Sequence, residues 1–173
     1  RQDPRVVVME RTNARHLEAL PEAVALVTID VSFISLTRIL PQVHRWLAPD
    51  GEVVALVKPQ FEAGPERVGK GGVVRDRGVH RDVLQTTLTW AQGNGWRVLG
   101  VTRSPITGPK GNVEFLVWLR VEHEPTGNGA RTDVDGLVDA AIALWDHDHG
   151  VGHDTVGVAE EEGLPAPERM GRA

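Results

Sequence analysis

Three ionisable residues lie where apolar segments of the chain end or pass through a core. Asp30 and Lys58 each follow an apolar run directly, and Glu114 lies within another run. Charged side chains are seldom fully buried without partners, so three of them on strand-like runs suggest strands that bring them together. A lysine between two carboxylates can accept and release a proton. Each residue taken alone is more often a solvated charge at the edge of a sheet.

The apolar pattern around these residues predicts an α/β fold. Lys58 and Pro59 close one strand-like run, because proline cannot continue a hydrogen-bonded ladder. Parallel strands joined by helices place their carboxyl ends at one edge of the sheet, where a functional site is expected. Only about ten residues separate the last two runs, too few for a crossover helix, so this pair should be antiparallel. The expected strands cover residues 5–9, 24–29, 52–57, 96–102 and 112–119, and the expected helices cover residues 36–47 and 79–92.

Five ordered segments form a more specific signature. They are DPRVVVMERTNARHL (3–17), TIDVSFISLTRILP (28–41), VALVKPQFEAG (54–64), VGKGGVVRD (68–76) and SPITGPKGNVEFLVWL (104–119). With these segments the chain resembles the TlyA-type, or haemolysin A, family of rRNA 2′-O-methyltransferases, which belongs to the wider FtsJ-like methyltransferase group. The resemblance runs from the N-terminus to about Arg120.

The resemblance implies a class I S-adenosylmethionine-dependent methyltransferase sheet, which is Rossmann-like and has an antiparallel last strand. The first two strands of that sheet, with the glycine-rich turn and the acidic residue that bind the cofactor, would precede Arg1. We therefore expect residues 1–120 to be a partial, N-terminally truncated FtsJ-like domain without the S4-like RNA-binding domain usual in the family. Missing neighbour strands would leave open sheet edges, so we expect poor solubility or association in isolation.

The resemblance assigns Asp30, Lys58 and Glu114 to three positions of the family's lysine–aspartate–lysine–glutamate tetrad, whose first lysine has no counterpart here. It implies methyl transfer from S-adenosylmethionine to a cytidine ribose of rRNA, with Lys58 handling the hydroxyl proton. An ordinary lysine is a poor base at neutral pH, so partial desolvation must offset the effect of the neighbouring acids. Our hypothesis is that the acids orient Lys58 and complement the positive sulfonium, while positioning supplies much of the acceleration.

Candidates for binding lie on loops expected near the strand ends. The resemblance nominates Glu10, Thr12 and Asn13 for the adenine side of the cofactor, with Asp30 facing the sulfonium side. Asn13 could equally be a helix N-cap or turn residue. Basic loop residues could meet rRNA phosphates, although each singly is more often a solvated charge. These residues are Arg67, Lys70, Arg75 and Lys110.

Charge divides the chain into a basic body and an acidic extension. Residues 1–120 contain 16 basic and 12 acidic side chains, a net charge of +4, whereas residues 121–173 contain 3 and 12, a net charge of −9. We expect residues 121–173 to be an acidic, disordered tail, in which residues 137–145 could form an amphipathic helix that docks on the body. Histidines and aspartates at 146–154 could bind a metal, but without supporting hydrogen bonds we expect no metal site. The absence of cysteine excludes disulfides and thiolate sites.

Two hypotheses about function follow, and a third has no support. No apolar run approaches the roughly 20 residues needed to span a bilayer, and no secretory signal opens the chain, so we expect a cytoplasmic protein without a membrane partner. The leading hypothesis is an S-adenosylmethionine-dependent methyltransferase acting on rRNA or ribosomal subunits. The alternative is a non-catalytic RNA- or ribosome-binding fragment, because the front half of the cofactor site is missing. A membrane-lytic role, which the haemolysin name suggests, lacks a lipid-length or strongly amphipathic segment.

Overall fold

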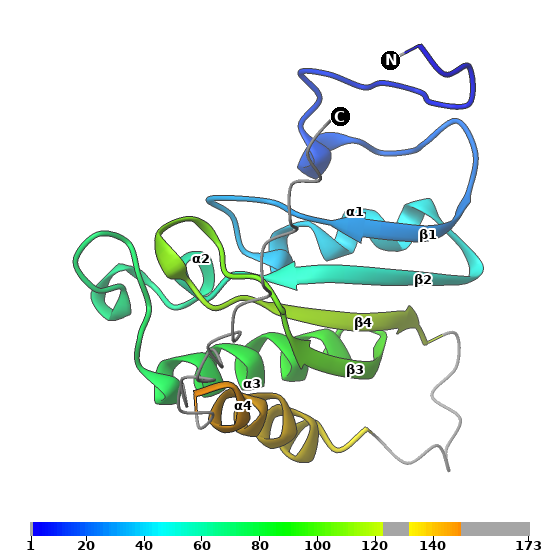
Figure 1. Cartoon of the computed structure of the whole chain (residues 1–173). Coiled ribbons are helices and arrows are strands. Elements are labelled where there is room, and N and C mark those ends of the chain that lie inside the picture. Colours follow the sequence, from blue (N-terminus) through cyan, green and yellow to red (C-terminus); the bar gives the residue numbers. More distant parts are fainter. Residues whose placement is uncertain (1, 123–131, 150–173) are drawn as a thin grey trace, which may run out of the picture.

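A computed structural model describes residues 2–122 and 132–149 of the chain. In this part of the chain, four strands form one mixed sheet in the order β1–β2–β4–β3 (Figure 1). β1 runs parallel to β2, and β4 runs antiparallel to both β2 and β3. The predicted α/β fold and the antiparallel pairing of the last two strands are therefore confirmed. The strands are β1 (Val24–Ile29), β2 (Leu47–Val57), β3 (Trp96–Arg103) and β4 (Phe115–Val121).

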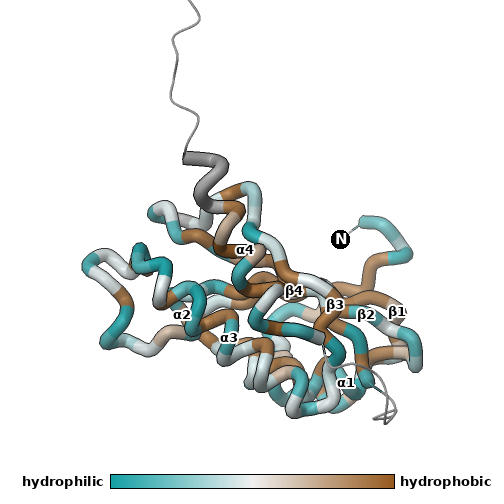
Figure 2. The backbone as a smooth tube through the Cα atoms, turned by 90° about the horizontal axis from the view of Figure 1, so that it is seen from below, coloured by the Kyte–Doolittle hydropathy of each residue, from teal (hydrophilic) through white to brown (hydrophobic). Residues whose placement is uncertain are grey.

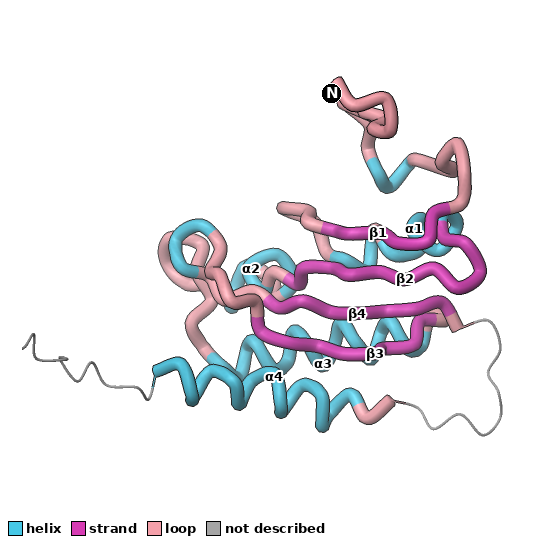
Figure 3. The backbone as a smooth tube through the Cα atoms, turned by 45° about the vertical axis from the view of Figure 1, so that its right-hand side comes forward, coloured by secondary structure: helices cyan, strands magenta, loops and turns pink. Residues whose placement is uncertain are grey.

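Helices cover one face of this sheet and the β3 edge. α1 and α3 lie behind the strands in Figure 3, and α4 lies along β3, where it contacts both β3 and α3. Pro41 occupies the start of α1 rather than bending it, and a 3₁₀ turn at Leu36–Arg38 forms the first part of the helix expected over 36–47. The helices are α1 (Leu40–Trp46), α2 (Pro59–Glu62), α3 (Arg77–Gly93) and α4 (Val134–His149). Further 3₁₀ turns span Ala14–His16, Pro65–Arg67 and Pro109–Gly111.

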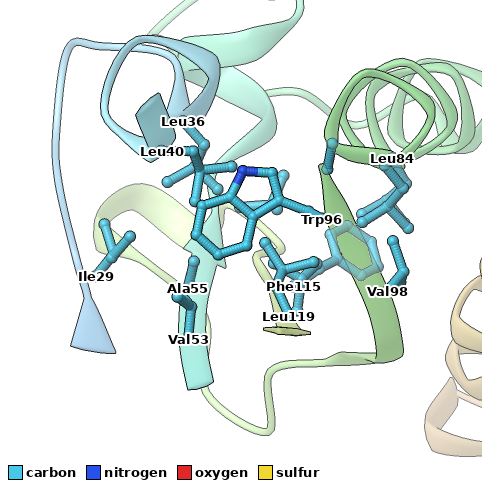
Figure 4. Packing of buried hydrophobic residues seen from close by; sticks show 14 of the residues in the cluster. Ile29, Leu36, Leu40, Val53, Ala55, Leu84, Trp96, Val98, Phe115 and Leu119 are labelled. Atoms are coloured by element: carbon cyan, nitrogen blue, oxygen red, sulfur yellow. The ribbon is translucent and has the colours of Figure 1, made fainter. Parts of the chain in front are cut away.

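The core lies between the sheet and the helices α1 and α3. Figure 2 shows hydrophobic stretches along the strands. Alternate residues of β2 and β4 are buried, as expected for strands with one covered face. Trp96 from β3 is 1% exposed and lies among side chains from α1, α3 and the sheet (Figure 4). The central buried residues include Leu40, Val53, Ala55, Leu84, Phe115 and Leu119.

The opposite face of the sheet is apolar but less covered. Val54 and Trp118 are directly opposite each other on β2 and β4, and Gly100 of β3 leaves room beside the indole. Trp118 is 44% exposed and Leu26 on β1 is 56% exposed. The Trp118 indole donates to Glu52 at 3.1 Å, and the Arg120 guanidinium holds the pKa of that carboxyl below its usual value. This face therefore leaves large apolar side chains in contact with water.

Helix α3 has local signals at both ends. The Asp76 carboxylate accepts from the Gly78 backbone N–H at 2.7 Å, which caps the N-terminus. The helix ends at Gly93, and Gly95 adopts a φ of 79° before β3 begins. Between these ends, residues at spacings of three and four are buried against the sheet. They are His80, Val83, Leu84, Thr87, Leu88 and Ala91.

The strand expected over residues 5–9 is wrong. Val6, Val7, Val8 and Met9 are 42–73% exposed, and the segment contains a turn in which Val6 N–H donates to Asp3 O at 3.0 Å. A β-branched run becomes a strand only when a neighbouring strand satisfies its backbone groups. No described strand pairs with residues 5–9, so the intrinsic preference of the run is not realised.

Part of the region expected to be a disordered tail is helical. Val134, Val138 and Ala141 of α4 are buried, and their spacing of four and three residues places them on one face of the helix. Thr132 anchors the start of this segment, because its hydroxyl donates to Val98 O at 2.8 Å and its carbonyl accepts from Gln92 Nε2 at 2.9 Å. The docking helix suggested around 137–145 agrees with α4. The division after residue 120 stays a prediction, and the side chains of the candidate metal stretch at 146–154 lie outside the description.

Protonation of His80 should destabilise the fold. His80 is fully buried, its Nε2 lies 3.1 Å from Val74 O, and its ring meets Phe115 edge-on at 5.8 Å. Burial lowers the pKa of His80 below its ordinary value of 6.5. The unfolded chain therefore binds the proton more readily, so the stabilisation is complete above that value and decreases as the pH falls through it toward the lower folded pKa.

Urea unfolding between about pH 7.5 and pH 5.5 measures this dependence, with a slope of at most about 1.4 kcal/mol per pH unit for one proton. His80→Gln should remove the His80 part of the slope, whereas the control His16→Gln, at an exposed position, should leave it unchanged. Equal slopes in His80→Gln and the parent chain would contradict the assignment.

Candidate active site

The sheet topology brings the three predicted residues to one edge. Asp30 follows β1 and Lys58 follows β2, so both lie at the carboxyl ends of parallel strands. Glu114 directly precedes β4, and because β4 is antiparallel to β2, its start lies at the same edge. The Glu114 carbonyl accepts from the Ser104 N–H at 2.9 Å, just after β3 ends. Figure 1 shows α2 at this edge of the sheet.

Asp30 and Lys58 form a direct ion pair. Lys58 Nζ lies 2.5 Å from Asp30 Oδ1, and it also donates to Ser32 Oγ at 3.4 Å. The lysine side chain is only 12% exposed, whereas the Asp30 side chain is 73% exposed. The carboxylate offsets part of the cost of removing the ammonium from water. The pair thus presents a largely desolvated amine beside an acid that solvent and ligands can reach.

Glu114 is linked to the lysine segment through Gln60. The carboxylate is buried, with the residue 6% exposed, and its Oε1 accepts from Gln60 Nε2 at 3.0 Å. Gln60 lies two residues after Lys58, on the single turn of α2. Gly108 packs against the carboxylate so closely that a Cβ at that position would clash with Oε1. The buried Glu114 carboxylate therefore accepts a hydrogen bond from Gln60 and packs against Gly108.

A second acid on α2 holds the loop that follows Asp30. Glu62 Oε1 accepts from the Leu36 N–H at 2.8 Å, 26 residues earlier in the chain. Burial raises the pKa of Glu62, while its hydrogen bonds with Ser35 and Leu36 act in the opposite direction. Sequence reasoning did not identify Glu62 or Gln60, because neither contact has a local signal.

Phe33 is an exposed aromatic beside this site. Phe33 is 89% exposed, its φ is 62°, and its ring centroid lies 4.8 Å from that of Phe61 on α2. The left-handed region disfavours a bulky residue, and such strain persists only where surrounding contacts impose it. Phe33 was also missed from the sequence, although its position three residues after Asp30 was a usable signal.

Three of the four predicted cofactor residues, Glu10, Thr12 and Asn13, lie on the N-terminal segment beyond the β1 edge (Figure 1), and the fourth, Asp30, follows β1. Asn13 caps the turn Ala14–His16, since its Oδ1 accepts from the Arg15 N–H at 3.0 Å. Thr12 Oγ1 donates to Glu10 O at 3.3 Å, and all three predicted side chains are at least partly exposed. The capping interpretation of Asn13 is thus realised, and the binding roles remain predictions.

The predicted RNA-binding residues lie on neighbouring loops, and two of them make internal contacts. Arg67 donates through Nε to Ala63 O at 2.8 Å and pairs with Asp82 at 3.3 Å. Lys110 Nζ donates to Gly71 O at 3.1 Å. Lys70 and Arg75 are exposed. Their roles toward RNA remain predictions.

Asn112 joins the two basic loops. Its Oδ1 accepts from the Val74 N–H at 3.1 Å and its Nδ2 donates to Gly72 O at 2.9 Å, while Asn112 itself is 3% exposed. A buried amide that is bonded on both sides holds the loop at 68–76 against the loop that contains Lys110.

Residues 2–122 and 132–149 contain no group of three His, Cys, Asp or Glu side chains that could hold a metal ion. No helix in these residues is long and apolar enough to cross a membrane.

The chain matches a family model and is similar to proteins named as rRNA methyltransferases and to a protein named as a hemolysin. Residues 1–121 match the model of the FtsJ-like methyltransferase family. YqxC of Bacillus subtilis (strain 168), a protein named as an rRNA methyltransferase, is 52% identical over 125 residues, covering 69% of this chain and 43% of that protein. The 16S/23S rRNA (cytidine-2′-O)-methyltransferase TlyA of Mycobacterium tuberculosis (strain ATCC 25618 / H37Rv) is 49% identical over 124 residues, covering 70% and 46%.

A solved structure extends the similarity to three dimensions. A hemolysin-named protein from Streptococcus thermophilus has a TM-score of 0.73 and 41% identity, covering 86% of this chain and 54% of that one. The chain thus spans less than half the length of the two curated relatives above.

Gly108→Ala should destabilise the fold by displacing Glu114. The added methyl would clash with Glu114 Oε1 and push the buried carboxylate from its Gln60 donor. A buried polar group that loses its partner costs about 1–3 kcal/mol, which urea unfolding can detect. The control Gly93→Ala, which meets no atom within 4 Å at the end of α3, should cause no loss.

The clash is specific to the glutamate side chain, so Gly108→Ala should cost little in a Glu114→Ala background. Additive losses in the double variant would show that Gly108 acts independently of Glu114.

Proposed function

Because the chain belongs to the FtsJ-like methyltransferase family, we propose that this protein methylates a ribose 2′-hydroxyl of rRNA with S-adenosylmethionine. The observation that carries the proposal is the desolvated Lys58, 12% exposed and 2.5 Å from Asp30, at the edge where the parallel strands end. Relatives at 52% and 49% identity have rRNA methyltransferase names, which supports the same reaction class.

Lys58 is the proposed proton-handling residue. Transfer forms a carbon–oxygen bond to the ribose, breaks a carbon–sulfur bond, and releases the hydroxyl proton, which must be accepted as the oxygen attacks. Lys58 must act in its neutral form to accept this proton directly. Ser32 and Asp30 hold its Nζ in one place, which keeps the amine oriented.

The exposed Asp30 carboxylate fits a cationic cofactor. S-adenosylmethionine, when bound, supplies an electrophilic methyl group on a positively charged sulfur. Asp30 is 73% exposed, so its negative charge can face such a group while Oδ1 holds Lys58. Roles for Glu10, Thr12 and Asn13 at the adenine side are part of the same proposal.

Phe33 and the basic loops are the proposed RNA contacts. An exposed ring supported by Phe61 offers a flat surface on which an unpaired base can stack. Exposed Lys70 and Arg75 can contact phosphates, and Arg67 and Lys110 contribute positive charge nearby. A cytidine in a ribosomal subunit is the proposed acceptor, and a cytoplasmic location is part of the same proposal.

A non-catalytic RNA-binding fragment is the second candidate. It is favoured by the exposed Phe33 ring and the exposed cations Lys70 and Arg75, which could bind RNA without any methyl transfer.

Methyl transfer from labelled S-adenosylmethionine to undermethylated ribosomal subunits tests the proposal. The comparison needs this chain and an extended form, in which the residues that precede the matched region of the Mycobacterium tuberculosis relative are joined upstream. Lys58→Ala in the extended form should reduce the rate at least about 100-fold, because it removes the proton acceptor. The control Arg97→Ala removes an exposed cation from β3 and should leave the rate unchanged. A folded extended form that binds ribosomes without methylating them would favour the second candidate.

Phe33→Ala should weaken RNA binding. Loss of one base–aromatic stack costs about 1–3 kcal/mol, so KM for the RNA should rise roughly 5-fold to 150-fold, with cofactor affinity unchanged. Phe33→Trp retains a flat ring and should keep KM near the parent value. An unchanged KM in Phe33→Ala would remove this residue from the RNA site.

A further inference from the structure

The turn α2 links Lys58 to two other parts of the site. Its four residues, Pro59–Glu62, follow the lysine directly, and Pro59 stands at the start of the helix, where a missing N–H costs nothing. Phe61 N–H donates to Lys58 O at 2.8 Å, which ties the turn to the lysine backbone. Side chains two and four residues after Lys58 then reach segments far away in the sequence.

Gln60 reaches Glu114, 54 residues away. Its Nε2 donates to Glu114 Oε1 at 3.0 Å, and its Oε1 is buried without a partner among the described residues. The opposite orientation of the amide would turn that oxygen toward the carboxylate, so the contact with Glu114 determines the orientation. The bond therefore fixes the amide and the acid relative to each other.

Glu62 reaches the loop that presents Phe33. Its acceptance of the Leu36 N–H at 2.8 Å closes a segment that begins at Asp30 and is also held through Ser32 and Lys58. The positive φ of Phe33 lies between these two attachment points. A strained residue keeps its conformation only while its flanks are held.

We propose that Gln60 and Glu62 are positioning residues, which hold Glu114 and the Phe33 loop respectively in register with Lys58. The inference rests on the proposed function, since it assigns roles within that reaction. Gln60 acts only through Glu114, and Glu62 acts only through the loop at 30–36. One helical turn, α2, thereby positions both Glu114 and the loop that carries Phe33 relative to Lys58.

Double-mutant cycles in the extended form test both roles by methyl transfer. Gln60→Ala should lower kcat about 10-fold to 100-fold with KM for RNA unchanged, and should cause no further loss in a Glu114→Ala background.

Glu62→Ala should raise KM for RNA, and should have no further effect on it in a Phe33→Ala background. Glu62→Gln keeps an acceptor oxygen and should restore KM, whereas Glu66→Ala, an exposed acid four residues later, is the neutral control.

If Gln60→Ala or Glu62→Ala has the same fold effect with and without the second substitution, the positioning role of that residue is overturned. A general loss of structure would produce this result, because it would affect each background equally. Melting temperatures of all variants identify any variant that is not folded at the assay temperature. A variant that fails this criterion is replaced by Gln60→Asn or Glu62→Asp, which shorten the side chain without removing its polar end.

A spectroscopic measurement keeps this inference separate from the proposed function. The Gln60 side-chain amide protons in the NMR spectrum should be shifted downfield by the carboxylate and should move in Glu114→Ala. If the parent form shows no methyl transfer, the proposed function fails, and an amide signal that is insensitive to Glu114→Ala would overturn the Gln60 contact as well. A signal that moves would retain the positioning of Glu114 in whatever reaction the site performs.

Discussion

The reversed direction of β4 is the constraint on which the site depends. A strand that ran parallel to its neighbours would place Glu114, which precedes it, at the opposite edge of the sheet from Asp30 and Lys58. Because β4 lies antiparallel between β2 and β3, the start of one strand meets the ends of the others. The short connection from β3 to β4 enforces this reversal, since it leaves no room for a crossover helix.

The charged groups at this edge of the sheet differ in how far they are desolvated and in what stabilises them. The Lys58 ammonium is largely removed from water and has a carboxylate at 2.5 Å, while that carboxylate remains in solvent. Glu114 is buried and has an uncharged amide donor. A buried ion pair needs good geometry to offset desolvation, and here only one partner of the pair is desolvated. The desolvation cost of the pair is therefore smaller than it would be if both charges were buried.

Apolar runs were sufficient to predict the elements that carry the site, because Asp30, Lys58 and Glu114 interrupt them in a recognisable way. The pattern failed at residues 5–9, where a β-branched run has no described neighbour strand to pair with, whereas the apolar spacing at 137–145 did indicate the docking helix α4 within an acidic segment. Gln60 and Glu62 could not be predicted from patterns alone, because their partners lie 54 and 26 residues away in the sequence. Phe33 had a signal in its position three residues after Asp30, but its positive φ has no local sequence signal.

The partly uncovered face of the sheet affects how the chain responds to heat and denaturant. Leu26 and Trp118 are already in contact with water in the folded state, at 56% and 44% exposure. Unfolding therefore hydrates less new apolar surface than it would in a domain of equal length with both faces covered. The heat-capacity change of unfolding and the denaturant slope both scale with that newly exposed area. Both quantities should be smaller for this chain, which gives a broader transition and a flatter dependence of stability on temperature.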